Sequence, residues 1–191
     1  AYTIVPVHLL KDGGQQLTPE HVARNPSKSV PVLAIDGLQL AQSTAIAEYL
    51  EETRPSPALM PSTPAARAIV RQLCCIVSND MQPVANLRTL KAVAALVEDP
   101  AKKDAAKLEW TRTTIRDGFA AFEAVLAKCA GKYCVGDELT LADVFLVPQV
   151  YNAVRFGVDL TAFPILNRIR TQLEELPAFK AAHPSVQPDA E

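Results

Sequence analysis

The first fifty residues alternate between short apolar runs and turn signals, which predicts a small sheet with flanking helices. Residues 2–10 are rich in large and β-branched side chains and end at the turn signal KDGG of residues 11–14, so they predict a short strand. Pro6 within this stretch cannot donate a ladder hydrogen bond, which places the strand at the edge of a sheet. The apolar runs 30–35 and 38–40 flank Asp36-Gly37, a pair typical of hairpin turns, and predict a β-hairpin.

Helix signals surround the predicted hairpin. Thr18 is an N-cap residue followed by Pro19 at the first helical position, and this predicts a brief helix that ends near Asn25. Ser43 is the predicted N-cap of a second helix, whose apolar residues recur at the i, i+3, i+4 spacing and which ends near Arg54.

The chain changes character after residue 54. Prolines interrupt residues 55–64, which we interpret as a linker between a first domain, 1–54, and a second domain, 65–191. Beyond the linker the apolar patterns have helical period: one long helix over 65–96 that bends at Pro83, another over 107–129, and shorter ones over 163–176 and 178–182. Thr140 and Asp143 form a capping box that predicts the start of a further helix. The predicted fold class is α/β plus all-α, with a partial α/β domain followed by an all-helical domain.

Composition narrows the classes of function. The chain has 19 Lys and Arg against 21 Asp and Glu, so no strong field gathers phosphates or anionic lipid, which argues against nucleic acid as a partner. The longest apolar stretches are far too short to cross a membrane. The four cysteines, at positions 74, 75, 129 and 134, fit neither zinc-ligand spacing nor a disulfide framework, which favours an intracellular setting and no metal site.

Three features of the first half together predict a pocket for a small peptide with a free carboxylate. Val30-Pro31 precedes a strand, a setting in which a cis peptide bond leaves the backbone of Val30 available to an extended ligand. Gln42 and Ser43 stand at the mouth of a helix, whose free N–H groups and dipole attract a carboxylate. Gln16 and Lys28 lie in adjoining loops. Each feature alone has an ordinary structural explanation, so the combination carries the prediction.

The order of these features is similar to that in the thioredoxin-like half of glutathione transferases. The resemblance rests on NPxxxVPxLxIDG over residues 25–37 and QSxAIxEYL over residues 42–50, and the capping box TLAD of residues 140–143 resembles that of their helical half. Other segments resemble the zeta class, the maleylacetoacetate isomerases: LKDGGQQ at 10–16, QPxxNL at 82–87, YCVGDE at 133–138 and LVPQV at 146–150. The similarity covers nearly the whole chain apart from a charged stretch at 98–107, which we interpret as a loop insertion.

The resemblance implies a glutathione site and a substrate site. The residues it implies for glutathione are Gln16, Lys28, Val30, Gln42, Ser43, Gln82 and Asn86. In such a site Ser43 and its helix N-terminus hold the γ-glutamyl carboxylate, and the backbone of Val30 pairs with the cysteinyl amide. Gln82 and Asn86 are four residues apart, so on the predicted long helix they share one face. Arg155 is similar to the arginine that the family uses on a substrate carboxylate, a task that suits a guanidinium group; a surface arginine that ends a helix is the alternative.

The catalytic group is the part of the family pattern that we do not find in this chain. Zeta-class enzymes carry a Ser-Ser-Cys segment on their first strand and helix, and this sequence begins after the corresponding position, so we expect the catalytic serine or cysteine to lie before Ala1. The four cysteines are interpreted as packing or turn residues. The histidines at 8, 21 and 183 have no acidic partner in register for a triad.

The activity that the resemblance implies is the glutathione-dependent cis–trans isomerisation of maleylacetoacetate to fumarylacetoacetate, in tyrosine and phenylalanine catabolism. Two alternatives stay open: a general glutathione transferase that acts on other electrophiles, and a non-catalytic interaction module with the same fold. The expected partners are glutathione, a small dicarboxylate-like electrophile and a second copy of the chain in a homodimer. The expected compartment is the cytoplasm, with a mitochondrial fraction as the alternative.

Overall fold

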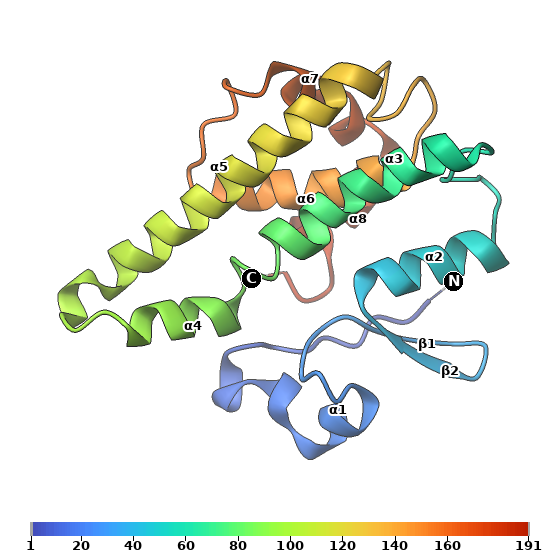
Figure 1. Cartoon of the computed structure of the whole chain (residues 1–191). Helices are drawn as coiled ribbons and strands as arrows, with labels where there is room; N and C mark the ends of the chain where they lie inside the picture. The colour runs from blue at the N-terminus through green and yellow to red at the C-terminus, as the bar shows by residue number, and fades with distance from the viewer. Residues whose placement is uncertain (1, 191) are drawn as a thin grey trace. The chain divides into compact units, whose positions relative to one another are not determined.

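Two compact units make up the structure, a computed structural model that describes residues 2–190. The first unit runs through Ser56 and also takes in the segment from Ala181 onward, and the second covers Pro57–Lys180. The division after Ser56 falls inside the stretch interpreted as a linker. The C-terminal segment, which the sequence analysis placed in the helical domain, clusters with the first unit. Figure 1 shows the elements of both units along the chain.

The first unit is built around the predicted hairpin. Two 3₁₀ turns, η1 (Lys11–Gly13) and η2 (Gln15–Leu17), lead into helix α1 (Pro19–Arg24), which begins behind the N-cap Thr18 as predicted. Strands β1 (Val32–Ile35) and β2 (Leu38–Ala41) pair antiparallel and are followed by helix α2 (Ser43–Thr53). Asp36 and Gly37 between the strands have φ values of 51° and 76°, the left-handed backbone that a tight hairpin turn requires.

The predicted strand over residues 2–10 is wrong, because this segment belongs to no helix or strand. An extended segment becomes a strand only when its backbone groups pair with a neighbour, and among residues 2–190 the sheet consists of β1 and β2. The end of the segment is bonded to the turn that follows it: His8 accepts the backbone N–H of Gln15 at 2.9 Å and donates its own N–H to the Gln15 side chain at 2.9 Å.

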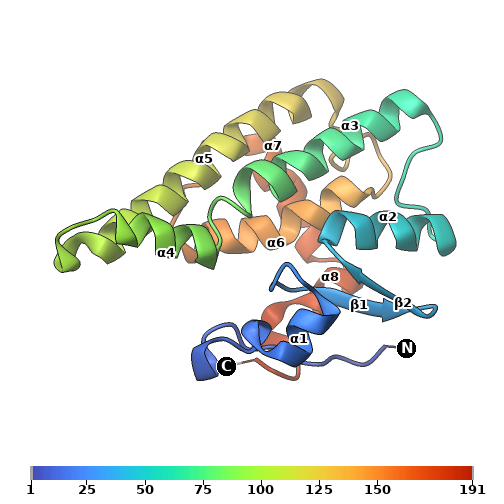
Figure 2. The ribbon, with the colours of Figure 1, turned by 60° about the horizontal axis from the view of Figure 1, so that its bottom comes forward.

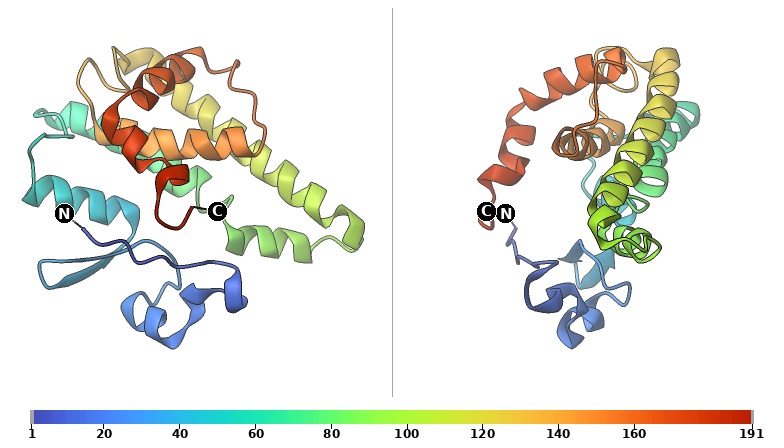
Figure 3. Two further views of the ribbon diagram at one scale, coloured as in Figure 1. Left: turned by 180° about the vertical axis from the view of Figure 1, so that it is seen from behind. Right: turned by 90° about the vertical axis from the view of Figure 1, so that its left-hand side faces the viewer.

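Four helices enclose the core of the second unit: α3 (Pro64–Cys75), α5 (Lys103–Cys129), α6 (Leu141–Arg155) and α7 (Pro164–Glu174). Helix α3 contacts both α5 and α6, and Figure 2 shows these helices with α4 (Leu87–Ala95) alongside the first part of α5. Helix α7 packs on α5 and α6 and leads into the short α8 (Pro177–Ala182), as the view from behind in Figure 3 shows. The short turn η5 (Pro184–Val186) follows. The fully buried side chains come from all four core helices: Val70, Leu73, Ile115, Phe119, Phe122, Leu146, Val150, Leu166, Ile169 and Leu173.

The predicted single helix over 65–96 is wrong in its middle. Helix α3 passes into a π-helical turn, η3 (Ile76–Met81). Here the hydrogen-bond spacing changes from four residues to five: the N–H of Gln82 donates to the carbonyl oxygen of Val77 at 2.9 Å. Pro83 then supplies no N–H, so the helix breaks instead of bending. Helix α4 starts anew, with Asn86 as the N-cap whose side chain accepts the first helical N–H at 2.7 Å. Gln82 and Asn86 therefore do not share a helix face.

Two helix starts follow from local capping. Asp143 is fully buried, and its carboxylate accepts the N–H of Thr140 at 2.8 Å and the Thr140 hydroxyl at 2.9 Å, which confirms the predicted start of α6. Helix α5 begins earlier than predicted, because Asp99 caps a 3₁₀ turn, η4 (Pro100–Lys102), that runs directly into it. The stretch interpreted as a loop insertion is thus largely helical. None of the helices described for residues 2–190 combines the length and the apolar character needed to cross a membrane.

Candidate functional site

The predicted peptide-binding loop lies between α1 and β1 and is held by side chains from α1. Asn25 donates its Nδ2 to the carbonyl oxygen of Ser29 at 2.8 Å, and its Oδ1 accepts the N–H of Ser27 at 3.0 Å. The N–H of Lys28 donates to the Asn25 carbonyl at 3.0 Å, and Lys28 has a left-handed φ of 56°. The exposed Lys28 side chain forms no ion pair with the described part of the chain. This arrangement leaves a positive charge available beside the loop.

The predicted cis bond between Val30 and Pro31 is present. Among residues 2–190, neither the N–H nor the C=O of Val30 enters a hydrogen bond, and the side chain is 43% exposed. Because Val32 pairs with Ala41, Val30 and the residue that follows β2 lie at the same end of the hairpin. The backbone of Val30 is therefore available to an extended ligand.

The start of α2 differs by one residue from the prediction. Gln42 is the N-cap, and its φ of 75° puts a non-glycine side chain in left-handed backbone, a strained conformation that is concentrated at functional sites. Ser43, predicted as the cap, is instead the first helical residue, and both side chains are exposed. The N–H groups of the first turn have no intrahelical partner and carry the positive end of the helix dipole, so this end of α2 suits a carboxylate.

Gln16 carries an unsatisfied acceptor. The side chain in η2 is only 7% exposed, its Nε2 donates to the carbonyl of Leu9 at 3.3 Å, and its Oε1 is buried without a partner among the described residues. Leaving a buried polar atom unpaired costs about 1–3 kcal/mol. Because the oxygen is buried, a ligand N–H would reach it only after the Gln16 side chain moves.

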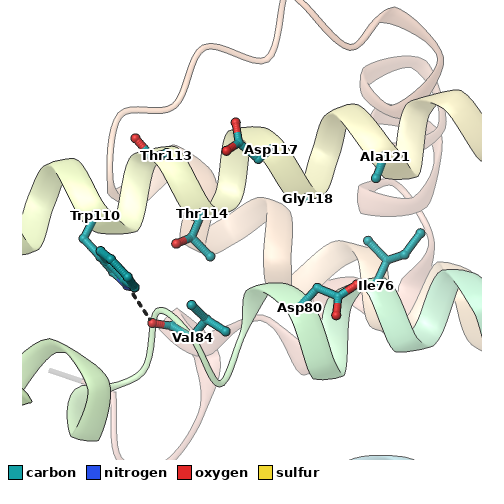
Figure 4. Close-up of a pocket in the computed structure, with 9 residues that line it drawn as sticks. All are labelled: Ile76, Asp80, Val84, Trp110, Thr113, Thr114, Asp117, Gly118 and Ala121. Carbon is teal, nitrogen blue, oxygen red and sulfur yellow. Dashed lines mark hydrogen bonds between the residues drawn. The ribbon is translucent and has the colours of Figure 1, made fainter.

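Gln82 and Asn86 lie in the second unit, at the two ends of the break between η3 and α4. The break is tied to α5 by Trp110, whose indole N–H donates to the carbonyl of Val84 at 3.0 Å (Figure 4). A pocket of about 430 Å³ lies between these elements, and its lining includes Asp80 and Asp117, both labelled in the same close-up. None of the predicted site residues lines this pocket.

Arg155 ends α6 in the second unit and is exposed. Its guanidinium lies 5.7 Å from the ring centre of Phe156, and no carboxylate of the described residues pairs with it. The carbonyl of Phe156 accepts the Nε–H of Arg112 at 2.7 Å, which fixes the end of the helix. The arginine is thus an unpaired, oriented cation.

Two of the four cysteines, Cys129 and Cys134, lie in surroundings that disfavour an activated thiol. Cys74 and Cys134 are buried, and Cys75 and Cys129 are partly exposed. Burial raises the pKa of Cys134 far above its usual value, and the negative charge of Asp143 adds to this rise. Burial also raises the pKa of Cys129. A raised pKa disfavours the thiolate, the form that acts as a nucleophile.

The sequence analysis missed one residue of this region. His21, which was read as carrying no signal, is 8% exposed, and its Nε2 lies 2.9 Å from the carbonyl oxygen of Ser29. The available signal was its spacing from Asn25: four residues apart on a helix, the two polar side chains share one face, and both meet the same carbonyl.

Comparison with known families and structures decides which fold family this is. Residues 1–52 match the family "Glutathione S-transferase, N-terminal domain", and residues 86–183 match "Glutathione S-transferase, C-terminal domain". The chain belongs to the glutathione S-transferase family. The small hairpin sheet followed by a helical unit is the family's thioredoxin-like domain followed by its helical domain, which confirms the predicted fold class.

The relatives lie in the zeta class of the family, as the resemblance suggested. The maleylacetoacetate isomerase of Mus musculus is 48% identical over 98% of this chain and 83% of that protein, and that of Dictyostelium discoideum is 47% identical over 100% and 85%. A bacterial zeta-class maleyl pyruvate isomerase in its holo form has a TM-score of 0.89 with 42% identity over 97% of this chain and 86% of that chain. The maleylacetoacetate isomerase of Anaeromyxobacter dehalogenans with bound glutathione has a TM-score of 0.80 with 44% identity over 90% and 79%.

Proposed function

We propose that this member of the glutathione S-transferase family is an enzyme that isomerises maleylacetoacetate to fumarylacetoacetate with glutathione, in tyrosine and phenylalanine catabolism. The observation that carries the proposal is the 48% identity with the mouse maleylacetoacetate isomerase over 98% of the chain. A relative this similar over nearly the whole chain carries the same fold, and the exposed backbone of Val30 and the start of α2 described above support a glutathione site in the first unit.

Glutathione fits the groups that the first unit offers. The backbone of Val30 has no hydrogen-bond partner among residues 2–190, the start of α2 at Ser43 suits a carboxylate, and Gln16 lies in the turn η2 that precedes α1. We propose that these residues hold glutathione together with Lys28 and Gln42. When bound, glutathione would supply the thiolate nucleophile of the isomerisation, while these residues would hold and orient it.

The second unit supplies the proposed substrate contacts. Arg155 would pair with a substrate carboxylate through two parallel N–H···O bonds, which orients the substrate as well as binding it. That Gln82 and Asn86 bind glutathione stays a prediction from the family resemblance, and the Trp110 hydrogen bond to Val84 holds the segment that carries them. A homodimer in the cytoplasm is part of the proposal and rests on the family resemblance.

The test is an isomerase assay with maleylacetone and glutathione, run beside a conjugation assay with an aryl halide. We expect turnover of maleylacetone to exceed conjugation. Conjugation without isomerisation would support the general transferase, and glutathione binding without either reaction would support the interaction module.

Arg155→Lys tests the substrate contact within the same assay. The lysine keeps the charge but loses the planar fork, so we expect KM for the dicarboxylate-like substrate to rise about tenfold while the glutathione Kd stays unchanged. Arg116→Lys, on the exposed face of α5, is the matched control and should leave both values unchanged. An unchanged KM in Arg155→Lys would refute the assignment of Arg155.

A further inference from the structure

The carbonyl oxygen of Ser29 is contacted by two buried side chains, one from α1 (His21) and one from its C-cap residue (Asn25). His21 approaches it through Nε2 at 2.9 Å, and Asn25 donates to it through Nδ2 at 2.8 Å. His21 is 8% exposed and Asn25 is 2% exposed. Because a carbonyl oxygen only accepts, the Nε2 of His21 carries the proton in this contact.

The position of Ser29 gives these two bonds their importance. Ser29 stands between Lys28 and Val30, both assigned to the glutathione site. Lys28 has the left-handed φ of 56°, which is unfavourable for a residue with a side chain. Val30 makes no backbone hydrogen bond with the described residues. Lys28 is held on one side by its N–H, which donates to the Asn25 carbonyl at 3.0 Å, whereas Val30 has no such bond, so the bonds to Ser29 supply the restraint on the Val30 side of the loop.

We propose that His21 is a positioning residue of the glutathione site, which acts through the Ser29 carbonyl to fix the backbone of Lys28 and Val30. This inference rests on the proposed function. His21 touches no ligand in this role. Burying a polar side chain costs free energy unless its hydrogen bonds are made. For His21, the bond to the Ser29 carbonyl offsets this cost, and that carbonyl lies between the two proposed glutathione-binding residues.

The first experiment measures the loop without any ligand. His21→Phe keeps an aromatic ring of similar volume but removes the donor, whereas His21→Gln retains an N–H at the end of a side chain of similar reach. We expect amide hydrogen exchange at Ser27 and Lys28, whose N–H groups bond to Asn25, to become about tenfold faster in His21→Phe and to stay near the wild-type rate in His21→Gln.

The second experiment measures the glutathione Kd by titration calorimetry. The loss of one net hydrogen bond predicts a Kd about 2–12-fold higher in His21→Phe, with recovery in His21→Gln. His183→Phe, the same substitution in the C-terminal segment, is the control and should bind as the wild type does. The thermal midpoint of each variant shows whether a weaker Kd reflects unfolding; if His21→Phe does not fold, the comparison of His21→Gln with His21→Ala takes its place.

The outcomes separate this proposal from the proposed function. A wild-type protein that binds no glutathione refutes the proposed function, while the exchange rates still decide whether His21 holds the loop. A wild-type protein that binds glutathione, with an unchanged Kd in a folded His21→Phe, refutes the positioning role alone. An equal loss in His21→Phe and His21→Gln also refutes it, because the donor would then not be the group that matters.

Discussion

Asp143 at the start of α6 is expected to be one of the residues on which stability most depends. Its side chain is fully buried and accepts three hydrogen bonds: from the N–H and the hydroxyl of Thr140 at 2.8 and 2.9 Å, and from the N–H of Cys134 at 2.9 Å. The carboxylate thus fixes the first turn of α6 and the preceding loop at the same time. Asp143→Ala removes the acceptor and leaves these donors in a space from which water is excluded.

The expected loss in the free energy of unfolding follows from the number of buried donors that are left without an acceptor. Two backbone N–H groups lose their partner, and each unsatisfied buried donor costs about 1–3 kcal/mol. The free energy of unfolding should fall by about 2–6 kcal/mol, and a loss of about 4 kcal/mol in a chain of this length lowers the thermal midpoint by about 8–16 °C. Asp143→Asn keeps one acceptor oxygen and should recover part of the loss.

The assay is urea unfolding followed by circular dichroism, with hydrogen exchange at Cys134 as the local measurement. Asp159→Ala is the matched control, because Asp159 also accepts two hydrogen bonds from a threonine, Thr161, but at an exposed turn. Its loss should be far smaller, since water replaces the missing acceptor. If Asp143→Ala is at least as stable as Asp159→Ala, then unpaired buried donors do not explain the contribution of Asp143, and the prediction is refuted.

Two further predictions concern single positions in each unit. In the first unit, a hydrogen bond from Tyr49 and then one from Arg54 lower the pKa of Asp36 below its ordinary 3.8, so the stability from this contact is present above that value and is lost as pH falls through the lower folded-state pKa. The stability difference between wild type and Asp36→Asn should therefore be constant above about pH 5 and shrink in acid; a constant difference down to pH 2 would contradict this. In the second unit, a Cβ at Gly118 would clash with the side chain of the buried Met81, so Gly118→Ala should lose about 1–3 kcal/mol in urea unfolding, and the same substitution should cost less in a Met81→Ala background.

The elements that could be predicted from the sequence are those defined by neighbouring residues. Asp36-Gly37 predicts the hairpin because these residues tolerate the left-handed backbone, and Thr18 predicts the start of α1 because its hydroxyl accepts the N–H of His21 at 3.3 Å. The capping box at Thr140 is local in the same sense. In each case the chemistry that decides the structure lies within four residues.

The predictions that are wrong concern segments whose structure depends on residues farther away in the sequence, or on two neighbouring signals that favour different structures. Residues 2–10 have strand composition, but composition does not supply the second strand that a ladder needs. The apolar residues keep their helical period through Pro83, so the pattern alone favours a bent helix. In the structure the backbone hydrogen bonds already have π spacing at Gln82. The shift of the cap from Ser43 to Gln42 depends on a φ of 75° that no propensity predicts.

The difference between local and distant determinants of structure also applies to the proposed site. The proposed binding residues are recognised one by one from the sequence, but in this proposal Val30 acts through its backbone, and a backbone group has no side-chain identity to mark it. What makes that group available is the conformation of residues 28–31, which depends on His21 and Asn25 through the carbonyl of Ser29. Substitution of the exposed Val30 side chain should therefore disturb glutathione binding less than removal of the buried donor at position 21. In a site built from main-chain groups, the residues that determine affinity are the ones that hold the main chain.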